Sequence, residues 1–430
     1  MALRAFMVRS GVTEPSVDNA SAPSASPSTS HDRDDARSLS GRVLGAFRYA
    51  LPALLGYIGV RAAGLIVFGI WARQRGDSIL GHLYSWDSYR YGDIAMWGYG
   101  RTVVGANGVV IGHSHLAFFP LYPLLIKFGM FFTGSSPRPA AIAVAWIASI
   151  AAAWGIFKVG DQLYGRRVGI FAAIAWGLLP NAIIAQMAYS ESLFTALAAW
   201  SLYHVLRRNW IAAATLSVLA GLTRPTGIAV AAAVCVGAFI ELVRHYRGSP
   251  SDTDDRQFPW RPVVAIVIAP AGWLGYFTYV SMRLKSLNGY FAVQHAWSSD
   301  FDPHLRFFGW MNHLLLRASP IPLNFGTVII VVMGAIVLLI LSILQRQPLP
   351  LITYSVVLLV IALGDHRAIW CEPRFLLPAF PLLLPIARAL AGARQKSTAY
   401  VMVGVGIVIS SVLSASFILL DVIGGRAYFP

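Results

Sequence analysis

Long apolar stretches recur along the chain from residue 46 to residue 420, with short polar segments between them. The hydrocarbon core of a bilayer is about 30 Å thick, so a helix needs roughly 20 apolar residues to cross it. Stretches of about this length without a charged residue are 139–157, 168–190, 262–282, 318–345 and 397–420. Segment 47–72 also qualifies, although it contains Arg61, and the shorter apolar stretches are 192–206, 209–223, 225–243, 347–364 and 375–387. The pattern predicts an all-α polytopic membrane protein with about eleven transmembrane helices.

The two ends of the chain differ from this apolar region. Residues 1–45 are rich in Ser, Pro, Asp and Arg and cannot bury enough apolar surface to fold alone, so we expect a disordered tail. No compact apolar run follows the first charges, which argues against a cleaved signal peptide. We expect residues 46–420 to form one transmembrane domain and residues 421–430 a short C-terminal segment.

The composition excludes several classes of protein. Hydrophobic residues make up 57% of the chain and charged residues only 12%, whereas a soluble domain has about 25% charged residues. This excludes an ordinary soluble enzyme, a disordered chain, a collagen-like fibre and a disulfide-rich scaffold. In a soluble protein the net charge of +15 would suggest nucleic acid. In a membrane protein, basic residues that fix the orientation explain it, so no nucleic-acid partner is expected.

The basic residues also predict the orientation. If the N-terminal tail is cytoplasmic and segment 116–134 is a re-entrant hairpin, each basic cluster between spans lies in the cytoplasm, as the positive-inside rule requires. Pro120 and Pro123 break regular helix geometry in that segment, which favours the re-entrant interpretation. The C-terminus is then extracytoplasmic. The long polar loops 73–115, 284–320 and 364–374 lie on the outer face, and the first outer loop with its re-entrant segment covers 73–134.

The first outer loop holds two acidic candidates in an aromatic-rich sequence. Asp87 follows Trp86, and Asp93 lies six residues further on, so the two carboxylates do not share a helix face well. Each is either a general base at a membrane-facing cleft or only the cap of a short helix. His115 precedes the two prolines of the re-entrant segment and is a candidate substrate contact.

Two further charged candidates interrupt apolar stretches. Glu191, in Tyr189-Ser190-Glu191-Ser192, either begins a helix, where negative charge is favoured, or belongs to a site. Arg224 stands between two apolar helices. A charged side chain there costs free energy, so an arginine at this position indicates a functional role. Its planar guanidinium suits a phosphate, although it could instead be a turn residue that reaches the outer headgroups.

The later outer loops add polar and basic candidates. Gln294 and Trp297 alternate with apolar residues, a pattern that suits a sugar-binding face and equally a plain interfacial helix. Arg367 and Arg374 close the last outer loop and are candidate partners of an anion.

Motifs for other chemistries are absent from the sequence. There is no Walker A sequence, Rossmann fingerprint, HExxH or CxxC pair, so we expect no nucleotide cofactor and no metal. An outer-face cluster of Asp87, Asp93 and Glu191 would be the one place for a divalent ion. Cys235 lies in an apolar run and Cys371 beside a polar loop, so a disulfide between them is not expected.

Several short motifs, in one order over residues 50–390, resemble the PIG-V family of polytopic mannosyltransferases, named for the enzyme that adds the second mannose to GPI anchors. They are Trp86-Asp87 with Ile94-Ala95 and Gly98-Tyr99, Ala117-Phe118-Phe119-Pro120, Tyr189-Ser190-Glu191-Ser192-Leu193-Phe194, Leu222-Thr223-Arg224 with Gly227, Gln294 with Trp297, and Pro373-Arg374-Phe375-Leu376-Leu377-Pro378. Pro225 and Thr226 depart from the family, since eukaryotic members often have Ser and Asn after the arginine.

This resemblance implies a GT-C glycosyltransferase fold in residues 46–420 and a multi-pass enzyme of the cell membrane. Such enzymes move a sugar, here a hexose expected to be mannose, from a polyprenyl-phosphate carrier to an acceptor on the extracytoplasmic face. Asp87 matches the acidic residue proposed as the base. The acceptor is expected to be a lipid or a cell-envelope glycan, because the Ala-, Arg- and Gly-rich composition suggests a bacterial protein and no GPI anchor.

These expectations assign a role to each candidate. Arg224, with Arg374 or Arg367, is expected to bind the donor phosphate, and a single displacement at the anomeric carbon should invert its configuration. The expected substrate contacts are Trp86, Asp93, His115, Glu191, Gln294 and Trp297. A transporter or flippase for a lipid-linked substrate explains the spans and the buried arginine equally well, and a scaffold of a cell-envelope complex is a third alternative.

Overall fold

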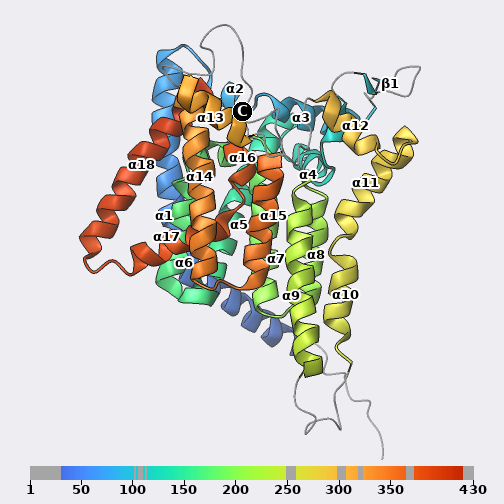
Figure 1. Ribbon diagram of the computed structural model, residues 1–430, viewed down its shortest axis with the longest axis vertical. Coiled ribbons are helices and arrows are strands. Elements are labelled where there is room, and N and C mark those ends of the chain that lie inside the picture. The colour runs from blue at the N-terminus through green and yellow to red at the C-terminus, as the bar shows by residue number, and fades with distance from the viewer. Residues whose placement is uncertain are drawn as a thin grey trace, which may run out of the picture. The chain divides into compact units, whose positions relative to one another are not determined.

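A computed structural model describes residues 31–100, 103–104, 110–111, 114–247, 258–297, 307–317, 323–364 and 372–419 (Figure 1). The chain divides into two units, Met1–Tyr49 and Ala50–Pro430. Of the first unit, the structure describes the N-terminal part of helix α1 (His31–Gln74). The second unit contains the rest of α1 and all the other elements.

Helix α1 starts earlier than the sequence predicts. Residues 31–45, which we expected in the disordered tail, are helical. Residues 1–30 lie outside the described part of the chain, so their disorder stays a prediction.

Six helical segments among the described residues are long and apolar enough to cross a membrane. They are Leu44–Gln74 in α1, α5 (Pro137–Tyr164), α9 (Gly227–Arg247), Trp260–Leu284, Phe325–Leu344 in α14 (Leu323–Leu344) and Lys396–Ser416 in α18 (Lys396–Leu419). Trp260–Leu284 comprises α10 (Trp260–Ile268) and α11 (Ala271–Leu284). Shorter apolar helices are α4 (Leu121–Met130), α8 (Trp210–Gly221), α15 (Leu349–Gly364) and Phe380–Ala391, which comprises η5 (Phe380–Leu383) and α17 (Leu384–Ala391).

One predicted span is interrupted. The sequence predicts a single helix over 168–190, but α6 (Arg166–Gly177) is followed only by the 3₁₀ helix η2 (Ala182–Gln186) before α7 (Glu191–Leu206) begins. Pro180 accounts for the break, because it has no backbone N–H to donate and disfavours a helical conformation in the preceding residue. Residues 181–190 are nevertheless all buried. Non-helical backbone at membrane depth is tolerated where protein covers it in this way.

The predicted first outer loop folds into short elements. It contains α2 (Ile79–Leu83), α3 (Asp87–Trp97), a hairpin of β1 (Val103–Val104) antiparallel to β2 (Val110–Ile111), and η1 (His115–Ala117). Helix α4 follows; its 10 residues span about 15 Å, half of the bilayer core, so it does not cross alone. This length is compatible with the re-entrant interpretation of 116–134, which stays a prediction.

The elements of the three predicted outer loops gather at one end of the long helices. Figure 1 shows α2 and α3 toward the same end as α12 (Gly289–Ala296), α13 (Phe307–Arg317) and α16 (Glu372–Leu376). The side of the membrane that this end faces stays a prediction.

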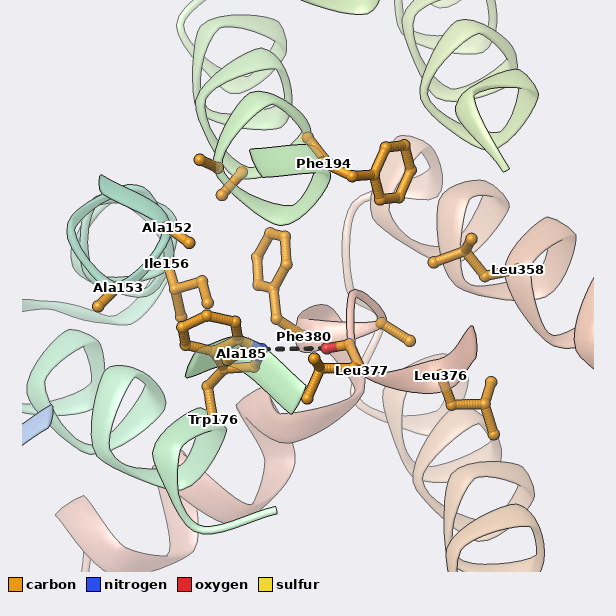
Figure 2. Packing of buried hydrophobic residues seen from close by; sticks show 14 of the residues in the cluster. Ala152, Ala153, Ile156, Trp176, Ala185, Phe194, Leu358, Leu376, Leu377 and Phe380 are labelled. Carbon is orange, nitrogen blue, oxygen red and sulfur yellow. Dashed lines mark hydrogen bonds between the residues drawn. The ribbon is translucent and has the colours of Figure 1, made fainter. Parts of the chain in front are cut away.

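Small residues allow α5, α6 and α7 to pack closely. A Cβ atom added to Gly155 would lie 2.9 Å from the Cβ atom of Ala199, and such close approach of backbones is typical of helix packing in membranes. Figure 2 shows the buried cluster beside them, in which the indole Nε1 of Trp176 donates to the carbonyl oxygen of Leu377 at 3.0 Å. This bond joins the end of α6 to the segment that follows α16.

Candidate active site

Four charged side chains from distant parts of the sequence meet in one place. They are Asp87, Glu191, Arg224 and Arg374, and we call them the charged cluster. Arg374 donates from Nη2 to Asp87 Oδ2 at 2.5 Å and from Nε to Glu191 Oε1. Arg224 donates from Nη1 to the same Glu191 oxygen at 2.6 Å. Glu191 therefore joins both arginines, and the four formal charges cancel.

Local backbone structure places each of the four. Asp87 and Glu191 are the first residues of α3 and α7, where the helix dipole favours a carboxylate. Arg224 lies in the tight turn between α8 and α9. A Cβ atom on Gly227 would lie 2.5 Å from the Cα atom of Gly221, so this approach of the two helices requires glycine. Arg374 belongs to the short helix α16.

The two carboxylates of the cluster differ in exposure. The Glu191 side chain is 0% exposed and that of Asp87 is 24% exposed, whereas the Arg224 and Arg374 side chains are 8% and 7% exposed. The second oxygen of Glu191, Oε2, is buried and has no hydrogen-bond partner among the described residues. Of the two carboxylates in the cluster, Asp87 is therefore the one that an incoming molecule reaches easily.

Uncharged residues complete the surroundings of the arginines. Ser190 Oγ accepts from Arg224 Nη1 at 3.2 Å and shares a 2.8 Å hydrogen bond with the Tyr91 hydroxyl. The Arg374 guanidinium stacks over the Tyr189 ring at 4.3 Å, a favourable cation–π contact.

Burial and charge act in opposite directions on the ionisation of these groups. Burial favours the neutral form of Glu191, but the Arg224 and Arg374 guanidinium groups outweigh it and hold the pKa of Glu191 below its ordinary value. Burial raises the pKa of Tyr91; Arg224 lowers it, and the Glu191 and Asp87 carboxylates raise it further. At neutral pH Glu191 is thus ionised and Tyr91 keeps its proton.

Other predicted site residues lie around η1 and α12. His115 Nε2 is 3.8 Å from Asp93 Oδ2, and Trp297 Nε1 donates to the Ser114 carbonyl at 2.9 Å. Gln294 Nε2 donates to the Tyr290 hydroxyl at 2.6 Å. Asp87 and Asp93 thus point to different neighbours, as their six-residue spacing predicts.

Trp86 and Arg367 are the remaining predicted site residues. Trp86 precedes α3 with a φ of 48°, in the left-handed region that a bulky residue rarely adopts, and its side chain is half-buried. Arg367 lies outside the described residues, as does Cys371. The other cysteine, Cys235, is free and half-buried.

The carboxylates do not form a metal site in the described part of the chain. No group of three or more His, Cys, Asp or Glu residues there could hold a metal ion. Asp87 and Glu191 are bound to arginine instead, and Asp93 faces His115.

Sequence reasoning did not single out Tyr91, Tyr189 or Ser190. A signal was present for each, because Tyr189 and Ser190 directly precede Glu191, and Tyr91 lies four residues after Asp87, on the same face of α3. A buried arginine also requires several acceptors, so polar neighbours of the two predicted carboxylates were the natural candidates.

The broken helices, the loop elements gathered at one end and the apolar spans define the architecture. Apart from the β1–β2 hairpin, the described residues form a helical, multi-pass membrane fold, and the helical polytopic fold class predicted from the sequence is confirmed.

One solved structure of ArnT shares this fold, and two others match more weakly. ArnT from Cupriavidus metallidurans bound to undecaprenyl phosphate matches with a TM-score of 0.51 and 18% identity, over 82% of this chain and 63% of ArnT. The apo form of ArnT matches with a TM-score of 0.47 and 17% identity, over 74% of this chain and 57% of ArnT. An oligosaccharyltransferase from Archaeoglobus fulgidus matches with a TM-score of 0.42 and 14% identity, over 87% and 53% of the two chains.

This chain spans less than two thirds of the length of ArnT. No protein-family model and no curated protein matches it. The likeness to ArnT establishes the fold.

Proposed function

We propose that this protein is a membrane glycosyltransferase. It moves a hexose from a polyprenyl-phosphate carrier to a lipid or cell-envelope glycan on the extracytoplasmic face. The charged cluster carries this proposal, because it presents two arginines and one accessible carboxylate at the end of the bundle where the predicted outer loops gather. The fold shared with ArnT bound to undecaprenyl phosphate supports the class of carrier. Mannose as the sugar, and membership of the PIG-V family, rest on the ordered sequence motifs.

Arg224 and Arg374 bind the carrier phosphate. A guanidinium group matches phosphate oxygens with two parallel hydrogen bonds, and each arginine already has an acidic partner to keep it charged inside the protein. Arg374 contacts Asp87 on the more exposed side of the cluster and Glu191 on the buried side. The incoming phosphate therefore replaces Asp87 at Arg374, while Glu191 keeps both arginines in place. Arg367 is proposed as a further phosphate partner from the sequence alone.

Release from Arg374 makes Asp87 the general base. Once the phosphate has taken its place at Arg374, the Asp87 carboxylate oxygen is available to accept a hydrogen bond from the acceptor hydroxyl. Asp87 accepts the proton of the acceptor hydroxyl, whose oxygen bonds to the anomeric carbon as the bond from that carbon to the phosphate oxygen breaks. The electron pair stays on the phosphate, where Arg224 and Arg374 stabilise the charge that develops. A single displacement inverts the anomeric configuration.

The residues around η1 and α12 are proposed to contact the sugar or the acceptor. Trp297 and Gln294 offer an aromatic face and an amide, and His115 with Asp93 offers further polar groups. Trp86 lies beside the base in sequence.

Product identification tests this function. Purified protein is incubated with labelled polyprenyl-phosphate-mannose and a membrane lipid extract, and the labelled products are identified by mass. We expect a new mannosylated lipid or glycan. Recovery of the labelled donor unchanged in mass on the other side of a vesicle would indicate a transporter or flippase instead.

Substitution of two different arginines, one inside the cluster and one outside it, provides a matched control. Arg374→Ala should abolish the product. Arg388→Ala should not, because Arg388 is an exposed arginine whose Nη1 bonds Gln345 Oε1 at 2.8 Å, outside the cluster. Equal product from both variants would contradict the assignment of Arg374.

A further inference from the structure

Arg61 is an arginine within the apolar body of α1, and the proposed chemistry does not use it. Its side chain is buried, with the residue 4% exposed, and no carboxylate among the described residues pairs with it. An ionised side chain inside a membrane span is costly and indicates a role that depends on it. Its partners identify that role.

Arg61 connects two points on either side of the break in the predicted span. Its Nη1 donates to the carbonyl oxygen of Gly177 at 3.1 Å, and its Nε donates to Gln186 Oε1 at 2.8 Å. Gly177 is the last residue of α6, so its carbonyl has no partner in the helix, and a cation at this end is favoured by the helix dipole. Gln186 is the last residue of η2. We call Arg61, Gly177 and Gln186 the Arg61 bridge.

Other contacts hold Gln186 in a single position. Its Nε2 donates to the Tyr57 hydroxyl at 3.3 Å, and its backbone carbonyl accepts from Trp146 Nε1 at 2.9 Å. The amide oxygen is then directed at Arg61. Tyr57, Arg61 and Gln186 are buried, so loss of one of these three side chains leaves its partners without a hydrogen bond and without water to replace it.

The segment fixed by the bridge leads directly into the charged cluster. Residues 178–190 end at Ser190, which binds Arg224, and Glu191 follows. Near its end the backbone N–H of Ala188 donates to the Leu83 carbonyl at 2.8 Å, four residues before Asp87. The segment therefore contacts the chain on the Asp87 side as well as the Arg224 side of the cluster.

We propose that Arg61 is a positioning residue for glycosyl transfer. It fixes the irregular segment 178–190 at its beginning, through Gly177, and again at Gln186, so that Ser190 and Glu191 are held where Arg224 and Arg374 meet the donor phosphate. A continuous helix would hold its own backbone, but a segment interrupted at Pro180 needs this external support. The catalytic part of this inference rests on the proposed function, whereas the structural part does not.

Hydrogen–deuterium exchange tests the structural part without any substrate. The full-length protein in lipid nanodiscs is compared with Arg61→Met and with Arg388→Met, a matched variant that removes an exposed arginine–glutamine bond. We expect amides of residues 178–190 to exchange at least about tenfold faster in Arg61→Met, because two hydrogen bonds from a charged group are lost. Arg388→Met should leave them unchanged. Unchanged exchange in Arg61→Met, or a rise spread over the whole chain, would overturn the proposal.

Gln186→Leu provides a second variant in case Arg61→Met does not fold. It removes the side-chain acceptor of the bridge but leaves the arginine and the Gly177 bond. Faster exchange confined to 178–190 is again expected, and unchanged exchange would contradict the bridge.

Transfer assays, normalised to folded protein, test the catalytic part. Arg61→Met should lower kcat about 10²-fold, the usual consequence of misplacing a catalytic group by about 1 Å. Arg61→Lys should recover part of this loss, because it keeps the charge but not the two-pronged guanidinium. The double variant Arg61→Met with Gln186→Leu should be no worse than Arg61→Met alone, since both remove one connection. Multiplied effects, or wild-type kcat in Arg61→Met, would overturn the positioning role.

The experiments can refute the proposed function and the Arg61 bridge independently of each other. Absence of transfer in the wild type, together with the expected exchange pattern, would refute the proposed function and leave the Arg61 bridge supported. Transfer in the wild type with unchanged exchange in Arg61→Met would refute the bridge alone.

Discussion

Two buried arginine networks contact the chain at the break between α6 and α7, and they are built differently: the Arg61 bridge spans the break, and the charged cluster lies where α7 begins. In the charged cluster, Arg224 and Arg374 face the carboxylates Glu191 and Asp87. In the Arg61 bridge, the acceptors of the single arginine are an amide oxygen and a helix-terminal carbonyl.

This difference suits the arginines of the cluster to exchanging one anionic ligand for another, and it suits Arg61 to holding the backbone in place. An arginine that faces a partly exposed carboxylate can exchange it for a phosphate without losing its charge compensation. An arginine bound by buried neutral groups has no anionic ligand to exchange, and its removal moves the backbone that it holds. The comparison therefore predicts changes of chemistry at the cluster and changes of geometry at the bridge.

The largest effect is expected at the exposed side of the cluster. Asp87→Asn should lower kcat about 10²–10⁴-fold, the usual contribution of a general base, because asparagine cannot accept the proton. Initial rates of transfer on purified protein measure it. Asp77→Asn is the matched control, since Asp77 belongs to the same predicted outer loop, but its Oδ2 lies 3.3 Å from His82 Nε2. Equal rates for the two variants would remove Asp87 from the role of base.

The buried side of the cluster should determine stability. Glu191→Gln leaves two buried arginines with one partly exposed carboxylate, and breaking a buried pair in this way costs about 3–5 kcal/mol. Chemical unfolding in detergent measures the loss. Glu241→Gln should cost about 0–1 kcal/mol, because Glu241 pairs at 3.2 Å with Arg208, whose side chain is 59% exposed. A similar cost for both variants would contradict the structural role of Glu191.

The same carboxylate predicts a pH dependence. The pKa of Glu191 is lower in the folded protein than its ordinary value of 4.5, so its ion pairs contribute fully above that pH and are lost as the pH falls further. Thermal unfolding between pH 7 and pH 3 should show wild-type stability falling below about pH 4.5 more steeply than that of Glu191→Gln. Parallel curves would contradict this assignment.

The smallest effect is expected at Tyr91. Tyr91→Phe removes its hydrogen bond to Ser190 but leaves the Arg224 bond in place, so the expected cost is about 0.5–1.5 kcal/mol in kcat/KM. Tyr354→Phe is the control, because it loses a buried hydroxyl that donates to the Pro378 carbonyl and contacts no member of the cluster through a hydrogen bond. A loss of activity confined to Tyr354→Phe would contradict the importance of Ser190.

The spans were predictable because a long apolar run that crosses a bilayer forms a helix, which satisfies its own backbone hydrogen bonds. The helices α5, α9, α14 and α18 follow the predicted stretches closely. The break within 168–190 was not predicted, because a buried irregular segment is as apolar as a helix, and Pro180 was the only strong signal.

The members of the site were more predictable than their pairing. Asp87, Glu191, Arg224 and Arg374 were singled out because charges beside apolar helices are rare. For Glu191 the two alternatives were a helix start and a site; the structure places it at the first position of α7 and also in the cluster. That Arg374 bridges the two carboxylates depends on how α3, α7 and α16 pack, and a linear pattern does not contain that information. Each catalytic role stays a prediction.

The central claim is that carrier phosphate displaces Asp87 from Arg374, and binding of the carrier alone tests it most directly. The affinity of a short-chain polyprenyl phosphate is measured for the wild type, Asp87→Asn and Arg224→Ala in the same detergent. We predict that Asp87→Asn binds at least as tightly as the wild type, because its arginine is no longer occupied, and that Arg224→Ala binds about tenfold or more weakly. Equal weakening of binding in both variants would contradict the account.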